Sequence, residues 1–275
     1  MSMDDCQYPA IYQAANDASI EAQSRYLRFV KVHSFLLTVA AGLGVYGIEH
    51  RESAIAAALV VVGAIFTALL MLTRRDQDTW YRARAVAESV KTSTWRFMMR
   101  ADPYLEAESI QEVKSGFRKR LCSILNEHKD SLHHLAGTVS ESEQITDEMC
   151  RVRLLPWKDR ASFYRENRID EQRTWYARKS AYNRQHGRIW FGILVVFQAL
   201  AVLFVILRVG YPDWGYWPSE VFLVAAGAAL TWIQVKKFRE LESVCDDDGL
   251  AQFVVDSENA FSREHTQWLA RKDSY

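Results

Sequence analysis

Histidines and a glutamate in the middle of the chain come closest to a metal-binding pattern. Glu127-His128 and His133-His134 fall in a segment with helical periodicity. In a helical zinc site two histidines lie four residues apart, because that spacing puts both rings on one face. Here the spacing is missed by one residue, so surface positions on a helix explain these side chains better than a metal site.

A second polar group lies near the C-terminus. Glu258, Glu264 and His265 can converge on a ligand, although charged positions on a solvated or inter-helix face explain them about as well. Catalysis needs a nucleophile, a base or a metal held in a concave site, and no acid pair, triad or phosphate loop stands out in the charged segments. The sequence therefore predicts a protein that is not an enzyme and that has no cofactor and no metal.

Three glycines reproduce the pattern of a dinucleotide-binding loop. Residues 42–47, GLGVYG, fit the fingerprint GxGxxG. That motif needs a preceding strand, a helix with a free N-terminus and an acidic residue further on, and the sequence offers none of this context. Close contact between two helices explains the glycines better.

The glycines lie in the first of four apolar segments, which cover residues 32–48, 53–73, 189–207 and 219–235. A helix rises about 1.5 Å per residue, so segments of this length approach the roughly 30 Å thickness of a bilayer's hydrocarbon core. Short polar loops separate the first segment from the second and the third from the fourth. We therefore expect four transmembrane helices arranged as two antiparallel hairpins.

Small residues recur in these segments, and charged residues are absent from their interiors. The lack of intramembrane charges argues against a proton-coupled transporter. Small side chains let helices approach closely, and they predict either packing within one hairpin or association of subunits around a pore. The candidates for membrane packing are Gly42, Gly44, Gly47, Ala40, Ala64, Ala68, Ala225 and Ala229.

Amphipathic charged helices are expected outside the membrane segments. Residues 76–99 carry a coiled-coil-like seam with spacings of three and four: Trp80, Ala83, Ala87, Val90, Thr94 and Phe97. A second helix is expected over about 106–134, with one face formed by Ile110, Val113, Phe117, Leu121, Ile124 and Leu132. Further helices are expected over 12–31, from 156 to the third apolar segment, and over 248–271.

The order of these elements is a repeat. Each copy consists of a long helix, a transmembrane helical hairpin and a long cytoplasmic helix, so the fold class is an all-α integral membrane protein. The polar and acidic stretch rich in Ser and Thr predicts a linker over 137–155. The expected domains are thus an N-terminal module, 1–136, and a C-terminal module, 156–275.

Charge and cysteine usage indicate the compartment. Near the apolar segments, Lys and Arg crowd one side, whereas Arg51 and Arg208 are alone on the other. By the positive-inside rule, both termini are cytoplasmic and the short loops face outward, in a multi-pass protein of the inner membrane. The four cysteines have no zinc-like spacing, no signal peptide is evident, and the formal net charge of zero argues against direct nucleic-acid binding.

Two parts of the chain resemble a known family. Residues 81–92, YRARAVAESVKT, followed by WRFMMRADP at 95–103, resemble the helix after the membrane hairpin in one subfamily of SLATT domains. Residues 253–268, FVVDSENAFSREHTQW, are similar to the end of a second subfamily, whose first helix looks like Gln172 to Tyr176 with Lys179. The resemblance covers nearly the whole chain as two different SLATT modules in tandem.

The resemblance implies a membrane effector of prokaryotic conflict systems that forms a pore when a linked sensor fires. We therefore expect a homo-oligomer in the lipid bilayer that acts in antiphage defence, with a sensor protein or a nucleotide second messenger as trigger. The alternative is a non-conducting scaffold that anchors a partner. The residues expected to set assembly or gating, unless they serve only packing and ion pairing, are Trp80, Arg84, Glu88, Lys91, Trp95, Trp175, Lys179, Glu258, Glu264, His265 and Trp268.

Overall fold

The computed structural model describes residues 3–47, 50–105, 109–127 and 144–238. These ranges are mostly helical and contain no strand, which confirms the all-α membrane fold that the sequence predicts. The elements in chain order are η1 (Asp5–Gln7), α1 (Ala10–Gly47), α2 (Arg51–Arg74), α3 (Asp76–Met99), α4 (Ile110–Glu127), α6 (Asp147–Leu154), α7 (Trp157–Tyr164), the π-helical η3 (Arg165–Asp170), α8 (Glu171–Gly210) and α9 (Ser219–Lys236). The helix expected over 248–271 lies outside the described residues.

The described residues fall into two compact units. The hairpin unit contains residues 24–75 and 177–238, and the core unit contains residues 3–23 and 76–176. The long helices α1 and α8 each contribute residues to both units, because each continues from a charged segment into an apolar one without interruption.

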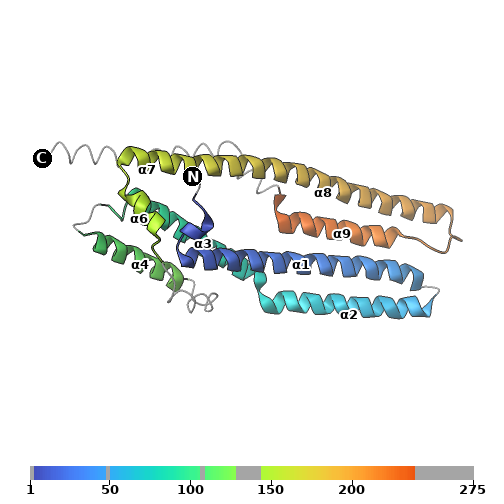
Figure 1. The fold of residues 1–275 in the computed structure, drawn as a ribbon. Coiled ribbons are helices and arrows are strands. Elements are labelled where there is room, and N and C mark those ends of the chain that lie inside the picture. The colour runs from blue at the N-terminus through green and yellow to red at the C-terminus, as the bar shows by residue number, and fades with distance from the viewer. Residues whose placement is uncertain (1–2, 48–49, 106–108, 128–143, 239–275) are drawn as a thin grey trace. The chain divides into compact units, whose positions relative to one another are not determined.

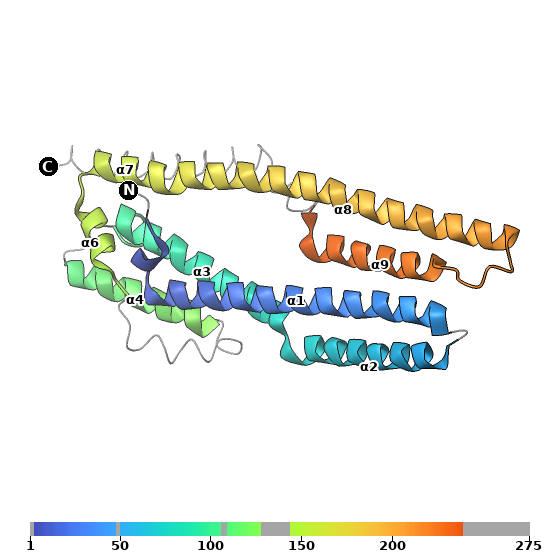
Figure 2. The same cartoon turned by 45° about the vertical axis from the view of Figure 1, so that its right-hand side comes forward.

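The hairpin unit is built from two antiparallel helix pairs. In Figures 1 and 2, α2 lies beside the second half of α1, and α9 lies beside the second half of α8. Three helical stretches of the described chain are long and apolar enough to cross a membrane: Ala10–Gly47, Arg51–Met99 and Trp157–Gly210. They contain the first three predicted spans. The fourth coincides with α9, an 18-residue helix with Glu220 in its first turn and Lys236 in its last, and its crossing stays a prediction.

Two helices of the hairpin unit end in the same way. Arg75 follows α2 with φ 48° and ψ 33°, and Lys237 follows α9 with φ 50° and ψ 39°. Both residues are in the left-handed conformation, which ends a helix because its dihedrals do not continue the right-handed spiral. Each apolar helix therefore stops at a basic residue directly after its last hydrophobic turn.

The core unit buries the seam that the sequence predicts on α3. Ala83, Ala87, Val90, Thr94 and Phe97 are all buried, whereas Trp80 is partly exposed. The predicted face of α4 is buried at Val113, Phe117, Leu121 and Ile124, but Ile110 is exposed because it is the first residue of the helix. One hydrophobic cluster joins both faces to the start of α1 and to α6. The seam of α3 thus packs against other helices of the same unit.

The turn of the first hairpin requires glycine at position 47. A Cβ atom there would lie 3.0 Å from the Cα atom and 3.1 Å from the backbone nitrogen of Ala54. Backbone cannot yield as a side chain does, so we expect Gly47→Ala to lower the free energy of unfolding by about 1–2 kcal/mol. Thermal unfolding in detergent micelles measures the loss.

Gly44→Ala is the matched control for this substitution. No atom lies within 4 Å of a Cβ atom built at Gly44, and alanine is the better helix former. We expect this variant to unfold no earlier than the native chain. If Gly47→Ala and Gly44→Ala lowered the free energy of unfolding equally, the close contact at Gly47 would not be the cause.

Candidate functional site

The predicted assembly residue Trp95 lies at the centre of the core unit. Its side chain is 3% exposed, and its indole Nε1 donates a hydrogen bond of 3.1 Å to the hydroxyl of Tyr8. The ring contacts those of Phe163 and Tyr164, with centroids 6.1 Å and 5.4 Å away. Trp95 thus connects α3 to the segment before α1 and to α7, three parts of the chain that are far apart in sequence.

The predicted basic residue Lys91 extends this cluster by one turn of α3. Its Nζ atom lies over the rings of Tyr8 and Tyr12, 5.3 Å and 5.8 Å from their centroids. A cation over an aromatic face is attracted by the ring quadrupole, and partial burial strengthens the attraction. Lys91 therefore stabilises the same contact between α3 and the start of α1 that Trp95 makes.

Arg84 and Glu88 occupy the outer face of α3. They form an i,i+4 ion pair with both side chains nearly half exposed, and Arg84 also donates a 3.5 Å hydrogen bond to the side-chain oxygen of Asn16. Exposed pairs of this kind contribute little to stability because water screens them. Because the Arg84 and Glu88 side chains are nearly half exposed, another chain can reach their charged groups.

The remaining predicted assembly residues do not join this cluster. Trp80 stacks on Tyr81, and its carbonyl oxygen accepts a hydrogen bond from Ser19. Trp175 is exposed and contacts the ring of Tyr176. Lys179 belongs to the hairpin unit. The predicted residues Glu258, Glu264, His265 and Trp268 lie outside the described residues.

Arg153 of α6 is a deeply buried cation of the core unit that the sequence analysis did not single out. Its side chain is 4% exposed, and its guanidinium donates hydrogen bonds to the carbonyl oxygens of Phe97 and Tyr104. It also lies over the Phe97 ring, 5.0 Å from the centroid. These carbonyls belong to the last turn of α3, where Phe97 also accepts a 3.3 Å hydrogen bond from the backbone nitrogen of Arg100, and to the turn that follows the helix. Arg153 therefore closes the C-terminal end of α3.

Three side chains near Arg153 have shifted ionisation. The guanidinium of Arg151 hydrogen-bonds the carboxylate of Glu148, which lowers the pKa of Glu148 and raises the pKa of Arg151. Burial raises the pKa of Tyr104, whose hydroxyl shares a 2.8 Å hydrogen bond with the hydroxyl of Ser93. The Ser93–Tyr104 bond joins α3 to the turn that follows it, whereas the Arg151–Glu148 pair lies within α6.

A histidine joins the two helices of the first hairpin. The Nδ1 atom of His33 lies 3.1 Å from the carbonyl oxygen of Ala64 and 3.2 Å from the hydroxyl of Thr67. Ala64 is buried at this contact. Polar bonds between helices are favoured in a membrane because lipid offers no alternative partner. The small side chain of Ala64 thus lets the imidazole reach the backbone of α2.

The other predicted packing residues differ in what surrounds them. Ala229 is buried with Leu194 and Ala226 in the small core of the second helix pair, and Ala225 is partly buried beside a cavity. Ala68 and Ala40 are also shielded, whereas a Cβ atom added at Gly42 or Gly44 would meet open space. Whether these residues pack within the chain or between subunits stays a prediction.

The sequence analysis also overlooked Gln198. This residue lies at the midpoint of the predicted span 189–207, and its side chain is exposed. It makes no hydrogen bond within the part of the chain that the structure describes. A primary amide in the interior of a 19-residue apolar run is a signal that the sequence does contain, because an unpaired amide is costly in hydrocarbon.

No described residues form a metal site: among them no group of three or more His, Cys, Asp or Glu side chains is close enough to hold an ion. Glu127 is the last residue of α4, and the three histidines of the candidate metal pattern lie outside the described residues.

Comparisons with known families agree with this architecture. Residues 9–161 match SMODS and SLOG-associating 2TM effector domain 3, and residues 164–246 match SMODS and SLOG-associating 2TM effector domain 1. No curated protein and no solved structure matches the chain. The first match alone covers more than half of the chain, and the second follows it directly. The chain therefore belongs to the SLATT family of two-transmembrane effector domains, with two different SLATT domains in tandem.

Proposed function

We propose that the chain is a membrane effector of a prokaryotic antiphage system, an oligomeric pore that opens in the inner membrane when a linked sensor is triggered. Both matched domains are described as effectors with two transmembrane helices. In this proposal α9 is the fourth span, and both termini face the cytoplasm. The sensor, or a nucleotide second messenger made by it, acts on the core unit.

The observation that carries the proposal is the exposed amide of Gln198. In a lone chain this side chain would face the middle of the hydrocarbon core without a hydrogen-bond partner among the described residues. Such a position is unfavourable in lipid, and it becomes favourable when the amide meets another subunit or water in a pore. The exposed face of α8 at Gln198 therefore suits a contact with a second copy of the chain or the lining of a channel.

The exposed apolar surfaces of α8 and α2 support membrane assembly as well. Val195, Val196 and Val202 are exposed on α8, and Leu59, Val62 and Phe66 are exposed on α2. Surfaces of this composition are stable in lipid or against the spans of another subunit. The proposal therefore places the conducting path between several chains.

Membrane potential tests the proposal. We expect bacteria that express the chain with its neighbouring genes to depolarise before they lyse when the system is triggered. Gln198→Leu should slow depolarisation roughly fivefold or more, because each interhelical amide contact contributes about 1 kcal/mol and recurs in every subunit. A voltage-sensitive dye follows the change over time.

Gln185→Leu is the control, because it makes the same substitution at an exposed position of α8 before the predicted span. It should depolarise cells like the native chain. An unchanged potential under triggering conditions, with the protein present in the membrane, would contradict the pore and favour the non-conducting scaffold. If Gln198→Leu and Gln185→Leu depolarised cells at the same rate, Gln198 would have no specific role in the pore.

A further inference from the structure

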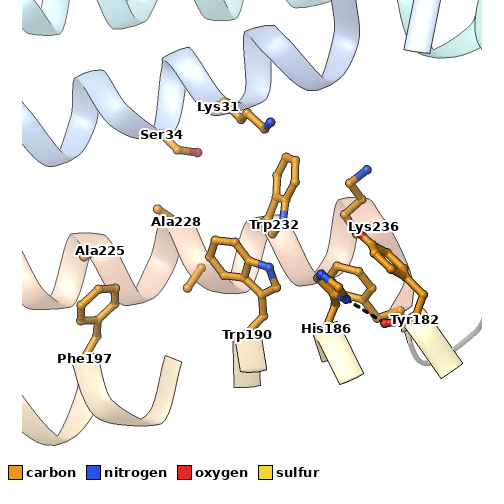
Figure 3. A pocket seen from close by; sticks show the side chains of 12 residues that line it. Lys31, Ser34, Tyr182, His186, Trp190, Phe197, Ala225, Ala228, Trp232 and Lys236 are labelled. Carbon is orange, nitrogen blue, oxygen red and sulfur yellow. Dashed lines mark hydrogen bonds between the residues drawn. The ribbon is translucent and has the colours of Figure 1, made fainter. Parts of the chain in front are cut away.

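A cavity of about 420 Å³ lies within the hairpin unit, between α1, α8 and α9. Its volume is in the range of small-molecule sites in proteins. Figure 3 shows its two ends: Lys236, His186 and Tyr182 gather at one, and Phe197 and Ala225 lie at the other. The cavity is therefore amphipathic along its length.

Lysines crowd the polar end of the cavity. The Nζ atoms of Lys31 and Lys236 lie 5.1 Å and 5.3 Å from the centroid of the same Trp232 ring, and Figure 3 shows both lysines beside it. A third lysine, Lys179, lies over Tyr182 at 5.2 Å. None of the described residues that line the cavity is an Asp or a Glu. This end is thus positively charged without a carboxylate in its wall.

The crowding affects the ionisation of Lys236, which is one residue beyond the predicted span 219–235. Burial lowers the pKa of its ammonium group, and the charges of Lys179 and Lys31 lower it further. An anion between these lysines removes the repulsion and restores a favourable partner for each charge. The polar end of the cavity is therefore electrostatically suited to a negatively charged group.

The positions of the polar lining residues in the sequence show where the cavity lies relative to the predicted spans. Lys31 directly precedes the first predicted span, His186 comes shortly before the third, and Lys236 directly follows the fourth. All three thus mark one membrane boundary, the cytoplasmic one by the positive-inside rule. Trp190 and Trp232 are at the same level, where aromatic side chains meet lipid headgroups.

The apolar end reaches toward the membrane interior. Phe197 lies one residue before the midpoint of its span, and the small side chains of Ala225 and Ala228 leave room beside it. A soluble anion gains little from this end, because Phe197, Ala225 and Ala228 have no hydrogen-bond donor in their side chains. An acyl chain fits it, since the walls are hydrocarbon.

We propose that this cavity binds one anionic phospholipid of the cytoplasmic leaflet. Lys31 and Lys236 hold its phosphate beside the ring of Trp232, and one acyl chain runs past Ala228 toward Phe197. The lipid joins α1 of the first hairpin to α8 and α9 of the second. The proposal depends on membrane insertion and not on conduction, so it can stand if the pore fails.

Lipid retention by the purified full-length chain tests the proposal. Native mass spectrometry from nanodiscs of phosphatidylglycerol mixed with phosphatidylcholine should show phosphatidylglycerol retained on the native chain. K31Q/K236Q should retain it roughly 30-fold more weakly, since each lysine near an anionic headgroup contributes roughly fivefold. K31R/K236R keeps both charges and should retain the lipid. K114Q/K119Q on α4 loses the same charge elsewhere and should behave like the native chain.

A second variant probes the apolar end without touching the lysines. Ala228→Phe fills the space for the acyl chain and should reduce phosphatidylglycerol retention at least tenfold, while thermal unfolding confirms that the variant is folded. Equal retention of phosphatidylcholine, or unchanged retention in folded K31Q/K236Q and Ala228→Phe, would overturn the proposal. So would displacement of the lipid by millimolar inorganic phosphate, which would identify the site as one for a soluble anion.

Discussion

Alanine at position 95 is expected to lower the free energy of unfolding of the core unit by about 3–5 kcal/mol, the usual loss for a large buried aromatic residue. Trp95 is almost fully buried and contacts the rings of Phe163 and Tyr164, so its removal leaves a cavity that rigid helices cannot close. This loss is a large share of the stability of a typical domain. Fluorescence-detected size exclusion and thermal unfolding of the solubilised chain measure it.

Trp95→Phe separates packing from hydrogen bonding at this position. Phenylalanine keeps most of the apolar contact and loses the bond from Nε1 to the hydroxyl of Tyr8. We expect a loss of about 1 kcal/mol from that bond, together with a smaller packing defect than alanine causes. If Trp95→Ala left both stability and triggered depolarisation unchanged, Trp95 would have no role in the core or in assembly.

The second large effect is expected at Arg153. Arg153→Ala removes two charge-assisted hydrogen bonds, to the carbonyl oxygens of Phe97 and Tyr104, and leaves both acceptors in a buried environment. Charge-assisted bonds contribute about 1.5–3 kcal/mol each, so the variant should lose about 3–5 kcal/mol of stability. Thermal unfolding and the yield of monodisperse protein report the loss.

Arg151→Ala provides the comparison on the same helix. Arg151 is half exposed and pairs with Glu148 on the surface, so its loss should change stability by no more than about 1 kcal/mol. Arg153→Lys keeps the charge but not the geometry that reaches two carbonyls, and should fall between the two alanine variants. Similar losses for Arg151→Ala and Arg153→Ala would contradict the role of Arg153 at the end of α3.

Helical periodicity explains why much of this fold was predictable. The seam from Ala83 to Phe97 is buried as expected, because a repeat of three and four residues always places one stripe on one face. Pro103 likewise disfavours helix at Asp102, and α3 ends shortly before it, at Met99, where Arg100 follows with φ 56°. Local rules of this kind need no knowledge of distant residues.

Contacts between distant segments are less accessible from sequence. Arg153 lies in a stretch interpreted as a polar linker, 137–155, yet from Asp147 to Leu154 the structure shows helix α6, with Met149 and Val152 buried in the core. An eight-residue helix is too short for its periodicity to be distinctive. Arg153 is important because it reaches two carbonyl oxygens about fifty residues earlier in the chain. The residues next to Arg153 in sequence do not reveal that contact.

In the apolar helices, too, local features were predictable from sequence and contacts between distant segments were not. Hydropathy predicted the spans, because length and composition alone decide whether a helix suits a bilayer. The cavity between α1, α8 and α9 depends on which faces of three helices meet, and Lys31 and Trp232 are about two hundred residues apart in the chain. The basic residues at the membrane boundary were visible in sequence, but their convergence on one ring was not.

The matching ends of α2 and α9 have a practical consequence for building chimeras. The two helices differ in sequence, yet each stops at a basic residue with nearly the same pair of dihedral angles. The left-handed conformation costs a non-glycine residue about 1–2 kcal/mol, so the conformation is held by its surroundings. A graft that swaps one hairpin for the other must therefore cut after Arg75 or Lys237 and carry that residue with it. A junction one position earlier would transfer the apolar helix and lose the left-handed residue that ends it.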